Sequence, residues 1–297
     1  TPDGFSFGEV SFITQKKDAM LRKGKLEKND VVLTTRGTVG NVAFYGERVL
    51  YSNVRINSGM LIIRPDPSVF CPEYVYWLFR SDVIQDQIKR FMSGTAQPQL
   101  PISSIKKFEI PLVDIKTQKE IAAILSALDE KIAINRAINV NLEQQAQTIF
   151  KYWFVDFEPF DGKLPSTWRS EKLGDVCNCV LGGTPSRAKP EYWDGTISWI
   201  NSGEVNKFRI IKPSETITDL GLSKSATKLL PAKTTVIAIT GATLGQVSLL
   251  EIDACANQSV VGIIPNSNYP YEYIYPLIKE NINQLTSHQT GGAQQHI

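Results

Sequence analysis

A loop rich in glycine and hydroxyl side chains is the strongest candidate for chemistry in this sequence. It reads Gly182-Gly183-Thr184-Pro185-Ser186-Arg187, and Lys189 follows two residues later. Backbone N–H groups and hydroxyls in such a loop can contact phosphates, and an arginine can read guanine through two hydrogen bonds. The expected nucleic-acid contacts are therefore Thr184, Ser186, Arg187 and Lys189. The alternative is an ordinary turn that precedes a strand.

Two further positions have side chains suited to nucleic-acid contacts. Arg36 stands beside Gly37 and Thr38, which makes Arg36 and Thr38 the corresponding candidates in the first third of the chain. Gln294 and Gln295 near the end of the chain could pair with adenine edges. The same glutamines could instead only cap their loop. Trp193 and Trp199 are expected to pack in a small core rather than to stack on bases.

Catalytic chemistry finds no support in the motifs. The sequence has two histidines, His288 and His296, and neither has a cysteine or carboxylate at metal-ligand spacing. Cys177 and Cys179 are too close for half of a zinc site and are expected to be buried small residues. We find no phosphate-binding Gly-x-x-x-x-Gly-Lys loop, no dinucleotide Gly-x-Gly-x-x-Gly motif, no Gly-x-Ser-x-Gly elbow and no adenine-methylating Asn/Asp-Pro-Pro-Tyr segment. We expect no catalytic residue, metal or cofactor.

Composition places the chain among ordinary globular proteins. Its 297 residues suffice for two domains, and 42% hydrophobic with 21% charged residues argues against disorder. There is no apolar run long enough for a membrane span and no signal peptide, and the four cysteines do not form a disulfide framework. A cytoplasmic protein is the simplest interpretation. The net charge is only +2, so any DNA binding must rely on local groove contacts rather than on bulk charge.

An internal repeat organises the sequence. Three segments recur in the same order, with offsets that fall from 205 to 197 residues: 31–40 with 236–245, 57–65 with 257–265, and 93–100 with 290–297. Such a pattern is typical of two copies of one domain that differ in their loops. Both copies are predicted to be α+β, with strands at Val31–Thr35 and Met60–Ile63 in the first, and Val236–Thr240 and Val260–Ile264 in the second.

A helix is expected after the last of these strands in each copy. Its apolar face is predicted to carry Val75, Leu78, Phe79, Val83 and Ile88 in the first copy. In the second copy the corresponding face carries Ile274, Leu277, Ile278, Ile282 and Leu285.

A long helix is predicted between the copies, because residues 117–155 contain no glycine and no proline. Apolar side chains alternate there at spacings of four and three, as in the seam of a coiled coil, and 39 residues make a rod of about 58 Å. Since an unpaired apolar stripe of this length is unfavourable in water, we expect a partner helix, although packing on the chain's own domains is the alternative. The expected packing residues are Ile121, Leu125, Leu128, Ile132, Leu142, Ile149 and Trp153.

The joint pattern of short motifs resembles a known family. The motifs are the loop at 182–186, Tyr192-Trp193-x-Gly195-x-Ile197-x-Trp199-Ile200, Ile217-Thr218-x-x-Gly221-Leu222-x-x-Ser225, the turn Gly241-Ala242-Thr243-x-Gly245, and Asn257-Gln258. Together they resemble the target-recognition domain of DNA-specificity subunits of type I restriction–modification systems. Leu164-Pro165-x-x-Trp168 and Lys172-Leu173-Gly174-Asp175-Val176 look like the start of that domain. Segments from Ile110-Pro111-Leu112 through Gln118-x-x-Ile121 to Phe150-x-x-Trp153-Phe154 resemble the family's central spacer helix.

The resemblance implies a function without catalysis. In this family two recognition domains each read one half of a split double-stranded DNA site, while antiparallel spacer helices set the gap and bind modification subunits. A restriction subunit joins them to cleave DNA. Compared with the family, the first copy is expected to lack the counterpart of residues 164–205, and the second spacer helix is absent, which indicates a fragment truncated at both ends. Alternatively, two chains pair their single helices as a homodimer.

We therefore predict an α+β chain of two repeated α/β target-recognition domains joined by a long coiled-coil-type spacer helix. The expected domains are residues 1–112 and 161–297, with the spacer at 113–160. Two other functions stay open at this point: a helical adaptor that recruits proteins without reading DNA, and the recognition region of a fused methyltransferase–nuclease. The DNA sequence that is recognised cannot be deduced from the residues.

Overall fold

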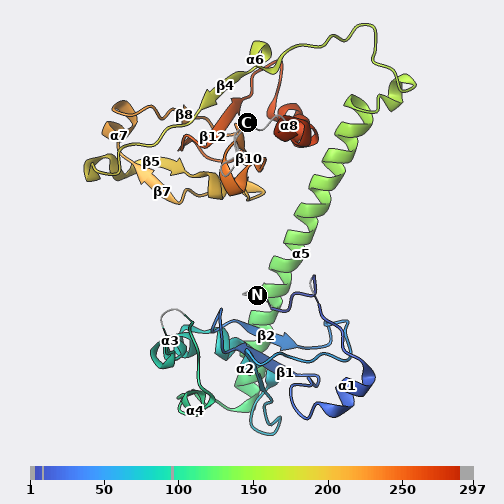
Figure 1. Cartoon of the computed structure of the whole chain (residues 1–297), viewed down its shortest axis with the longest axis vertical. Helices are drawn as coiled ribbons and strands as arrows, with labels where there is room; N and C mark the ends of the chain where they lie inside the picture. The colour runs from blue at the N-terminus through green and yellow to red at the C-terminus, as the bar shows by residue number, and fades with distance from the viewer. Residues whose placement is uncertain (1–3, 9, 95–96, 288–297) are drawn as a thin grey trace. The chain divides into compact units, whose positions relative to one another are not determined.

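The computed structural model describes residues 4–8, 10–94 and 97–287. The chain divides into two compact units, Thr1–Ala137 and Ile138–Ile297, which we call the first and second units. The division falls inside α5 (Ile115–Phe154), drawn in green in Figure 1, so each unit includes one half of this helix. The predicted spacer helix is confirmed within one or two residues at each end.

The first unit is built on a three-stranded antiparallel sheet in the order β2-β1-β3. Its elements are α1 (Gln15–Met20), β1 (Asp30–Thr34), β2 (Val42–Tyr45), β3 (Met60–Ile63), α2 (Pro72–Arg80), α3 (Asp82–Phe91) and α4 (Ile102–Ile105). One face of the sheet packs against α2 and α3, and Val31, Leu33 and Val42 are buried there. Helix α2 lies against β1 and β2, and α3 packs beside α2 (Figure 1).

The prediction of a single helix in the first copy is wrong, because two helices, α2 and α3, occur there. Ser81 adopts an extended backbone, at φ −73° and ψ 154°, and ends α2 while it precedes α3. Its N–H and its hydroxyl both donate to the carbonyl of Leu78, at 3.1 and 2.7 Å. The break turns Val83 outward, where 53% of it is exposed, while Leu78 and Ile88 remain in the core.

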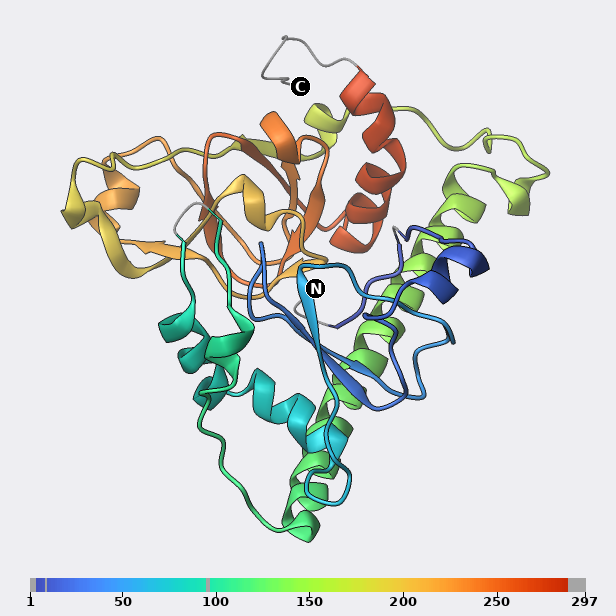
Figure 2. The same cartoon turned by 60° about the horizontal axis from the view of Figure 1, so that its bottom comes forward.

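The second unit contains two sheets, in the orders β4-β12-β9-β10-β6 and β7-β5-β11-β8. The larger sheet comprises β4 (Asn178–Leu181), β6 (Arg209–Ile210), β9 (Thr235–Ala238), β10 (Val247–Leu250) and β12 (Val260–Ile264). The smaller sheet comprises β5 (Trp193–Ile200), β7 (Glu215–Ile217), β8 (Leu229–Leu230) and β11 (Ala254–Ala256). The helices are α6 (Leu173–Val176), α7 (Asp219–Ser223) and α8 (Tyr271–Ser287), with 3-10 turns at Glu158–Phe160, Pro190–Tyr192, Ser202–Glu204 and Gly241–Thr243. Helix α8, red in Figures 1 and 2, packs beside β9 and β10.

Strand pairing confirms the internal repeat. In the first unit β1 pairs antiparallel with β2 and β3, and in the second unit β9 pairs antiparallel with β10 and β12. An isolated bridge between Lys25 and Arg55 stands where Leu229 pairs with Cys255 in the second copy. The shared core of each copy is therefore a three-stranded antiparallel unit whose first strand is central, and the second copy adds β4 at the outer edge of β12.

Cysteine burial differs from the expectation at one position. Cys177 is buried, but Cys179 is exposed because it lies in β4, the edge strand of the larger sheet. Burial raises the pKa of the thiols of Cys71, Cys177 and Cys255, which lowers the reactivity of these three side chains.

A buried carboxylate fixes the start of β1. The fully buried side chain of Asp30 accepts hydrogen bonds from Nε and Nη2 of Arg64, at 2.7 and 2.8 Å, and from the N–H of Glu27 at 2.7 Å. Replacing Asp30 with asparagine removes the charge from this pair, and we expect the first unit to lose about 2 kcal/mol of unfolding free energy. Hydrogen exchange of the β1–β3 amides in the full chain measures this loss.

Glu27→Gln provides a matched control for that experiment. Glu27 pairs with Nη1 of the same arginine at 2.6 Å, but its side chain is 69% exposed. Water replaces an exposed partner at little cost, so this variant should change stability by under about 0.5 kcal/mol. Equal effects of the two substitutions would show that burial of Asp30 is not what stabilises β1.

Candidate nucleic-acid interface

The glycine-rich loop connects β4 to the 3-10 turn before β5. Gly182 and Gly183 are buried, and their N–H groups donate to the carbonyls of Val260 and Ala256, at 2.9 and 2.8 Å. A Cβ atom on Gly182 would lie 2.1 Å from the carbonyl oxygen of Asn257. The two glycines therefore serve a close backbone crossing, and their N–H groups are already bonded within the protein rather than directed at a phosphate.

Two tryptophans hold the rest of the loop. The indole N–H of Trp199 donates to the carbonyl of Gly183, and that of Trp193 donates to the carbonyl of Ser186, each at 3.2 Å. The two rings meet edge to face with centroids 5.1 Å apart. Trp199 is 2% exposed and Trp193 packs on the same apolar cluster, which confirms the expected core role of both.

The guanidinium of Arg187 lies over the ring of Trp193 and near that of Trp199. Its guanidinium carbon is 3.6 Å from the ring centroid of Trp193 and 5.2 Å from that of Trp199. Nη1 approaches Oε2 of Glu215 in β7 to 2.7 Å. Glu215 is not among the predicted site residues, because nothing in the sequence around it signals a contact with a loop 28 positions earlier.

The other predicted loop residues lie at the surface of the second unit. Thr184, Ser186 and Lys189 are exposed. The Thr184 hydroxyl donates to Oε1 of Gln258, and Lys189 donates to the Tyr192 hydroxyl at 3.1 Å. This bond raises the pKa of Lys189 above its usual value, so the ammonium stays charged at neutral pH. The loop therefore presents two cations and two hydroxyls on one short exposed segment.

The candidates in the first unit lie in the turn after β1. Arg36 and Thr38 are exposed, and Arg36 forms an isolated bridge with Gln99, which brings this turn beside the segment that follows α3. The Thr38 carbonyl accepts a hydrogen bond from the Thr34 hydroxyl. Gln294 and Gln295, which are also predicted to contact nucleic acid, lie outside the described residues.

The predicted seam of α5 is largely uncovered. Ile121 and Leu125 are half-buried in the first unit. Five other seam residues expose between 43% and 60% of their surface: Leu128, Ile132, Leu142, Ile149 and Trp153. These exposures show that most of the stripe is uncovered among the described residues, and its role as a packing surface stays a prediction.

The distal half of α5 has its own contacts in the second unit. Glu143 accepts hydrogen bonds from the Tyr275 hydroxyl and from Lys279 of α8, at 2.8 and 2.6 Å. Burial and the neighbouring carboxylate of Glu143 raise the pKa of Tyr275 well above its usual value, which keeps the phenol a donor. Helix α8 is therefore joined to α5 by these polar contacts and by packing of the Tyr273 ring on those of Phe150 and Phe154, with centroids 5.5 and 5.1 Å apart.

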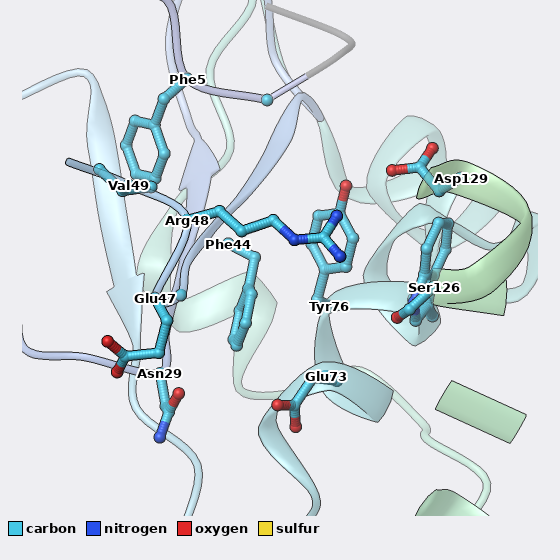
Figure 3. A pocket seen from close by; sticks show the side chains of 13 residues that line it. Phe5, Asn29, Phe44, Glu47, Arg48, Val49, Glu73, Tyr76, Ser126 and Asp129 are labelled. Carbon is cyan, nitrogen blue, oxygen red and sulfur yellow. The ribbon is translucent and has the colours of Figure 1, made fainter. Parts of the chain in front are cut away.

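A cavity of about 480 Å³ opens between the sheet and α5 within the first unit (Figure 3). Phe44 and Tyr76 lie in its centre, and Arg48 extends across it to pair with Glu130 of α5 at 2.8 Å. Three carboxylates line it: Glu47, Glu73 and Asp129. Negative charge of this kind repels phosphates, so the cavity is not suited to a nucleic-acid backbone.

Across residues 4–8, 10–94 and 97–287, no three histidine, cysteine or acidic side chains come close enough to hold a metal ion. No helix in the same part of the chain is both long and apolar enough to cross a bilayer.

Comparison with known sequences identifies the family. Residues 10–144 and 165–297 each match the pattern described as "Type I restriction modification DNA specificity domain". The chain belongs to this family. The two matches coincide with the two copies of the repeat, and the short gap between them contains the end of α5 and the segment that leads into the second specificity domain.

Two relatives of this chain are both named as specificity subunits of type I restriction enzymes. "Type I restriction enzyme MjaIX specificity subunit" of Methanocaldococcus jannaschii is 29% identical over 245 residues, which cover 78% of this chain and 55% of the relative. "Type I restriction enzyme HindI specificity subunit" of Haemophilus influenzae is 23% identical over 338 residues, covering 90% and 73%. The chain thus spans about half the length of the first relative and about three quarters of the second.

A solved structure shows the same fold. The S subunit of the type I restriction–modification system of M. genitalium superimposes with a TM-score of 0.54 at 17% identity, covering 89% of this chain and 67% of that one. At this identity the likeness concerns the fold of the specificity domains alone. It agrees with the predicted arrangement of two α+β domains joined by a long helix.

Proposed function

We propose that this chain recognises DNA as the specificity subunit of a type I restriction–modification complex. The observation that carries the proposal is that a DNA-specificity domain occurs twice in one chain, once in each structural unit. Two such domains fit a bipartite double-stranded site, with one half read by each unit. The names of the M. jannaschii and H. influenzae relatives support the same assignment.

The exposed loops would make the DNA contacts. In the second unit Arg187 would contact a base edge, while Thr184, Ser186 and Lys189 would bind phosphates. Gln294 and Gln295 would pair with adenine edges. In the first unit Arg36 and Thr38 would take the equivalent place. The near-zero net charge of residues 161–297 agrees with recognition by a few placed side chains rather than by a basic surface.

Other subunits would perform the chemistry. We propose that the exposed apolar stripe of α5 binds a partner helix, either in a modification subunit, in a longer form of this subunit or in a second copy of this chain. A restriction subunit would complete the complex, which would act in the cytoplasm. The chain itself is assigned no catalytic step and no cofactor.

The direct test is selection from a randomised DNA pool, with the chain alone and with a modification subunit of the same system. Enrichment of a short motif is the expected result, and the Arg187→Ala variant should bind that half-site about 1–3 kcal/mol more weakly. Competition binding at fixed salt measures the difference, since phosphate contacts make affinity depend strongly on salt.

Arg169→Ala is the matched control for Arg187→Ala. Arg169 is also a surface arginine of the second unit, and it pairs with Glu171 at 2.7 Å. Its removal changes the net charge equally but should leave the affinity for the selected half-site within about twofold. If both variants lost the same affinity for the half-site, the contribution of Arg187 would be its charge alone. A pool without any enriched motif would refute DNA recognition itself.

A further inference from the structure

Arg187 is held in place without using its hydrogen-bond donors. The guanidinium stacks on Trp193, and Nη1 stands 2.7 Å from Oε2 of Glu215. Nevertheless, this buried oxygen accepts no hydrogen bond from any described residue. The contact is therefore an ion pair that lacks the alignment of a hydrogen bond. Stacking and charge fix the plane of the guanidinium, and its donors stay available to an outside acceptor.

The group also faces outward. The Arg187 side chain is 56% exposed, whereas 37% of the Glu215 side chain is exposed and Trp193 is half-buried beneath the guanidinium. Glu215 belongs to β7, whose residues pair with β5 on the rigid smaller sheet. Although Arg187 lies in a loop, its guanidinium is supported by Trp193 of β5 and Glu215 of β7, and this support gives it the fixed geometry that base recognition needs.

We propose that Arg187 reads the guanine of one G·C pair in the major groove, with Trp193 and Glu215 as its positioning residues. The proposal rests on the DNA-binding function proposed above and names the base that the second unit recognises. Guanine fits because its O6 and N7 are two adjacent acceptors, and a fixed guanidinium can donate to both at once. Adenine places a donor at N6, where one of these bonds would form.

Glu215 has a second effect on the same contact. Its charge repels phosphates and neutralises Arg187, so it weakens binding to DNA that lacks the guanine. When the guanine is present, the two base contacts offset this repulsion. Glu215 therefore increases the ratio of specific to non-specific affinity at the cost of total affinity.

The test uses the full chain and the half-site selected for the second unit. In the wild-type protein, replacing the critical G·C pair by A·T should weaken binding about 5- to 150-fold. Substituting 7-deazaguanine, which lacks the N7 acceptor, should cause part of that loss in the wild type and none in Arg187→Ala. Arg187→Lys keeps the charge but should also lose the dependence on N7, because an ammonium does not donate in a fixed plane.

Glu215→Gln distinguishes positioning from a merely structural role. We expect the penalty for replacing the guanine to shrink severalfold, while affinity for unrelated DNA rises severalfold. The slope of log affinity against log salt should steepen by about 0.9, the value for one additional phosphate contact. Glu171→Gln, which frees Arg169 in the same unit, is the control and should leave the guanine penalty unchanged.

The outcomes separate this inference from the function on which it rests. A selected motif in which no guanine depends on Arg187 overturns the inference and leaves DNA recognition standing. A Glu215→Gln variant with lower thermal stability but unchanged base penalties also overturns it, because Glu215 would then only stabilise the fold. If no DNA sequence is enriched, the proposed function and the inference both fail.

Discussion

Replacing Gly182 with alanine should destabilise the second unit by about 3 kcal/mol and abolish its binding to DNA. The added Cβ would lie 2.1 Å from the Asn257 carbonyl oxygen and 2.5 Å from that of Ala256, and both atoms belong to backbone that cannot rotate aside. The backbone must therefore separate at the crossing, which breaks the bond from the Gly182 N–H to Val260. Thermal unfolding and competition binding of the full chain measure the two effects.

Gly174→Ala is the control for that variant. A Cβ atom there meets nothing within 4 Å, and the residue lies in the exposed short helix α6 of the same unit. Alanine in a helix should be neutral or slightly stabilising. If Gly182→Ala proved as stable as Gly174→Ala, the crossing would be looser than the structure shows, and the loop would then have the flexibility that its glycine content predicts.

This loop shows where sequence-based prediction reaches its limit. The motif correctly predicts a loop with exposed Thr184, Arg187 and Lys189, because glycine and proline are local signals. It attributes the two glycines to flexible phosphate contacts, whereas they are packed under residues 256–260, more than 70 positions later in the chain. Glu215 is likewise absent from the predicted site, since a contact between this loop and the distant strand β7 leaves no trace in local spacing.

Elements with strong local periodicity are predicted much better. The strands Met60–Ile63 and Val260–Ile264 occur with the predicted bounds, and the other two shift by one or two residues. The repeat adds information because it tests each assignment twice. The prediction of one helix per copy fails at Ser81, where a serine with an extended backbone breaks the helix in the first copy only. Neither apolar spacing nor propensity marks such a break, because serine is acceptable both within helices and before them.

The prediction of the spacer helix is only partly confirmed. Its length follows from 39 residues without glycine or proline, but the seam analysis does not reveal that each half is attached to a different unit. The attachments combine polar and apolar contacts: Glu143 and Phe150 contact α8 in the second unit, and Gln118 is buried near the core residue Ala122 in the first. Polar residues of a helix are expected at its solvated face, so a buried glutamine escapes a search for apolar periodicity.

Replacing Gln118 with leucine should cost the first unit about 3–5 kcal/mol. Gln118 is fully buried; its amide oxygen accepts from the Cys71 N–H at 2.8 Å, and its amide nitrogen donates to the carbonyls of Val69 and Val113, at 3.0 and 2.9 Å. Leucine has a similar volume but leaves all three backbone groups buried without a partner. Hydrogen exchange of the amides in α2 and at the start of α5 should show both segments opening.

Two further variants isolate the hydrogen bonds as the cause. Gln87 of α3 makes the same kind of bridge to Glu109, accepting at 2.9 Å and donating at 2.8 Å, but at the surface, so Gln87→Leu should cost under about 1 kcal/mol. Gln118→Glu keeps the shape and loses the donor at neutral pH, and it should be as damaging as leucine. Because protonation restores a donor to the glutamate, its deficit should narrow as the pH falls, whereas that of Gln118→Leu should not. Equal pH profiles would show that packing, rather than these three bonds, attaches α5 to the first unit.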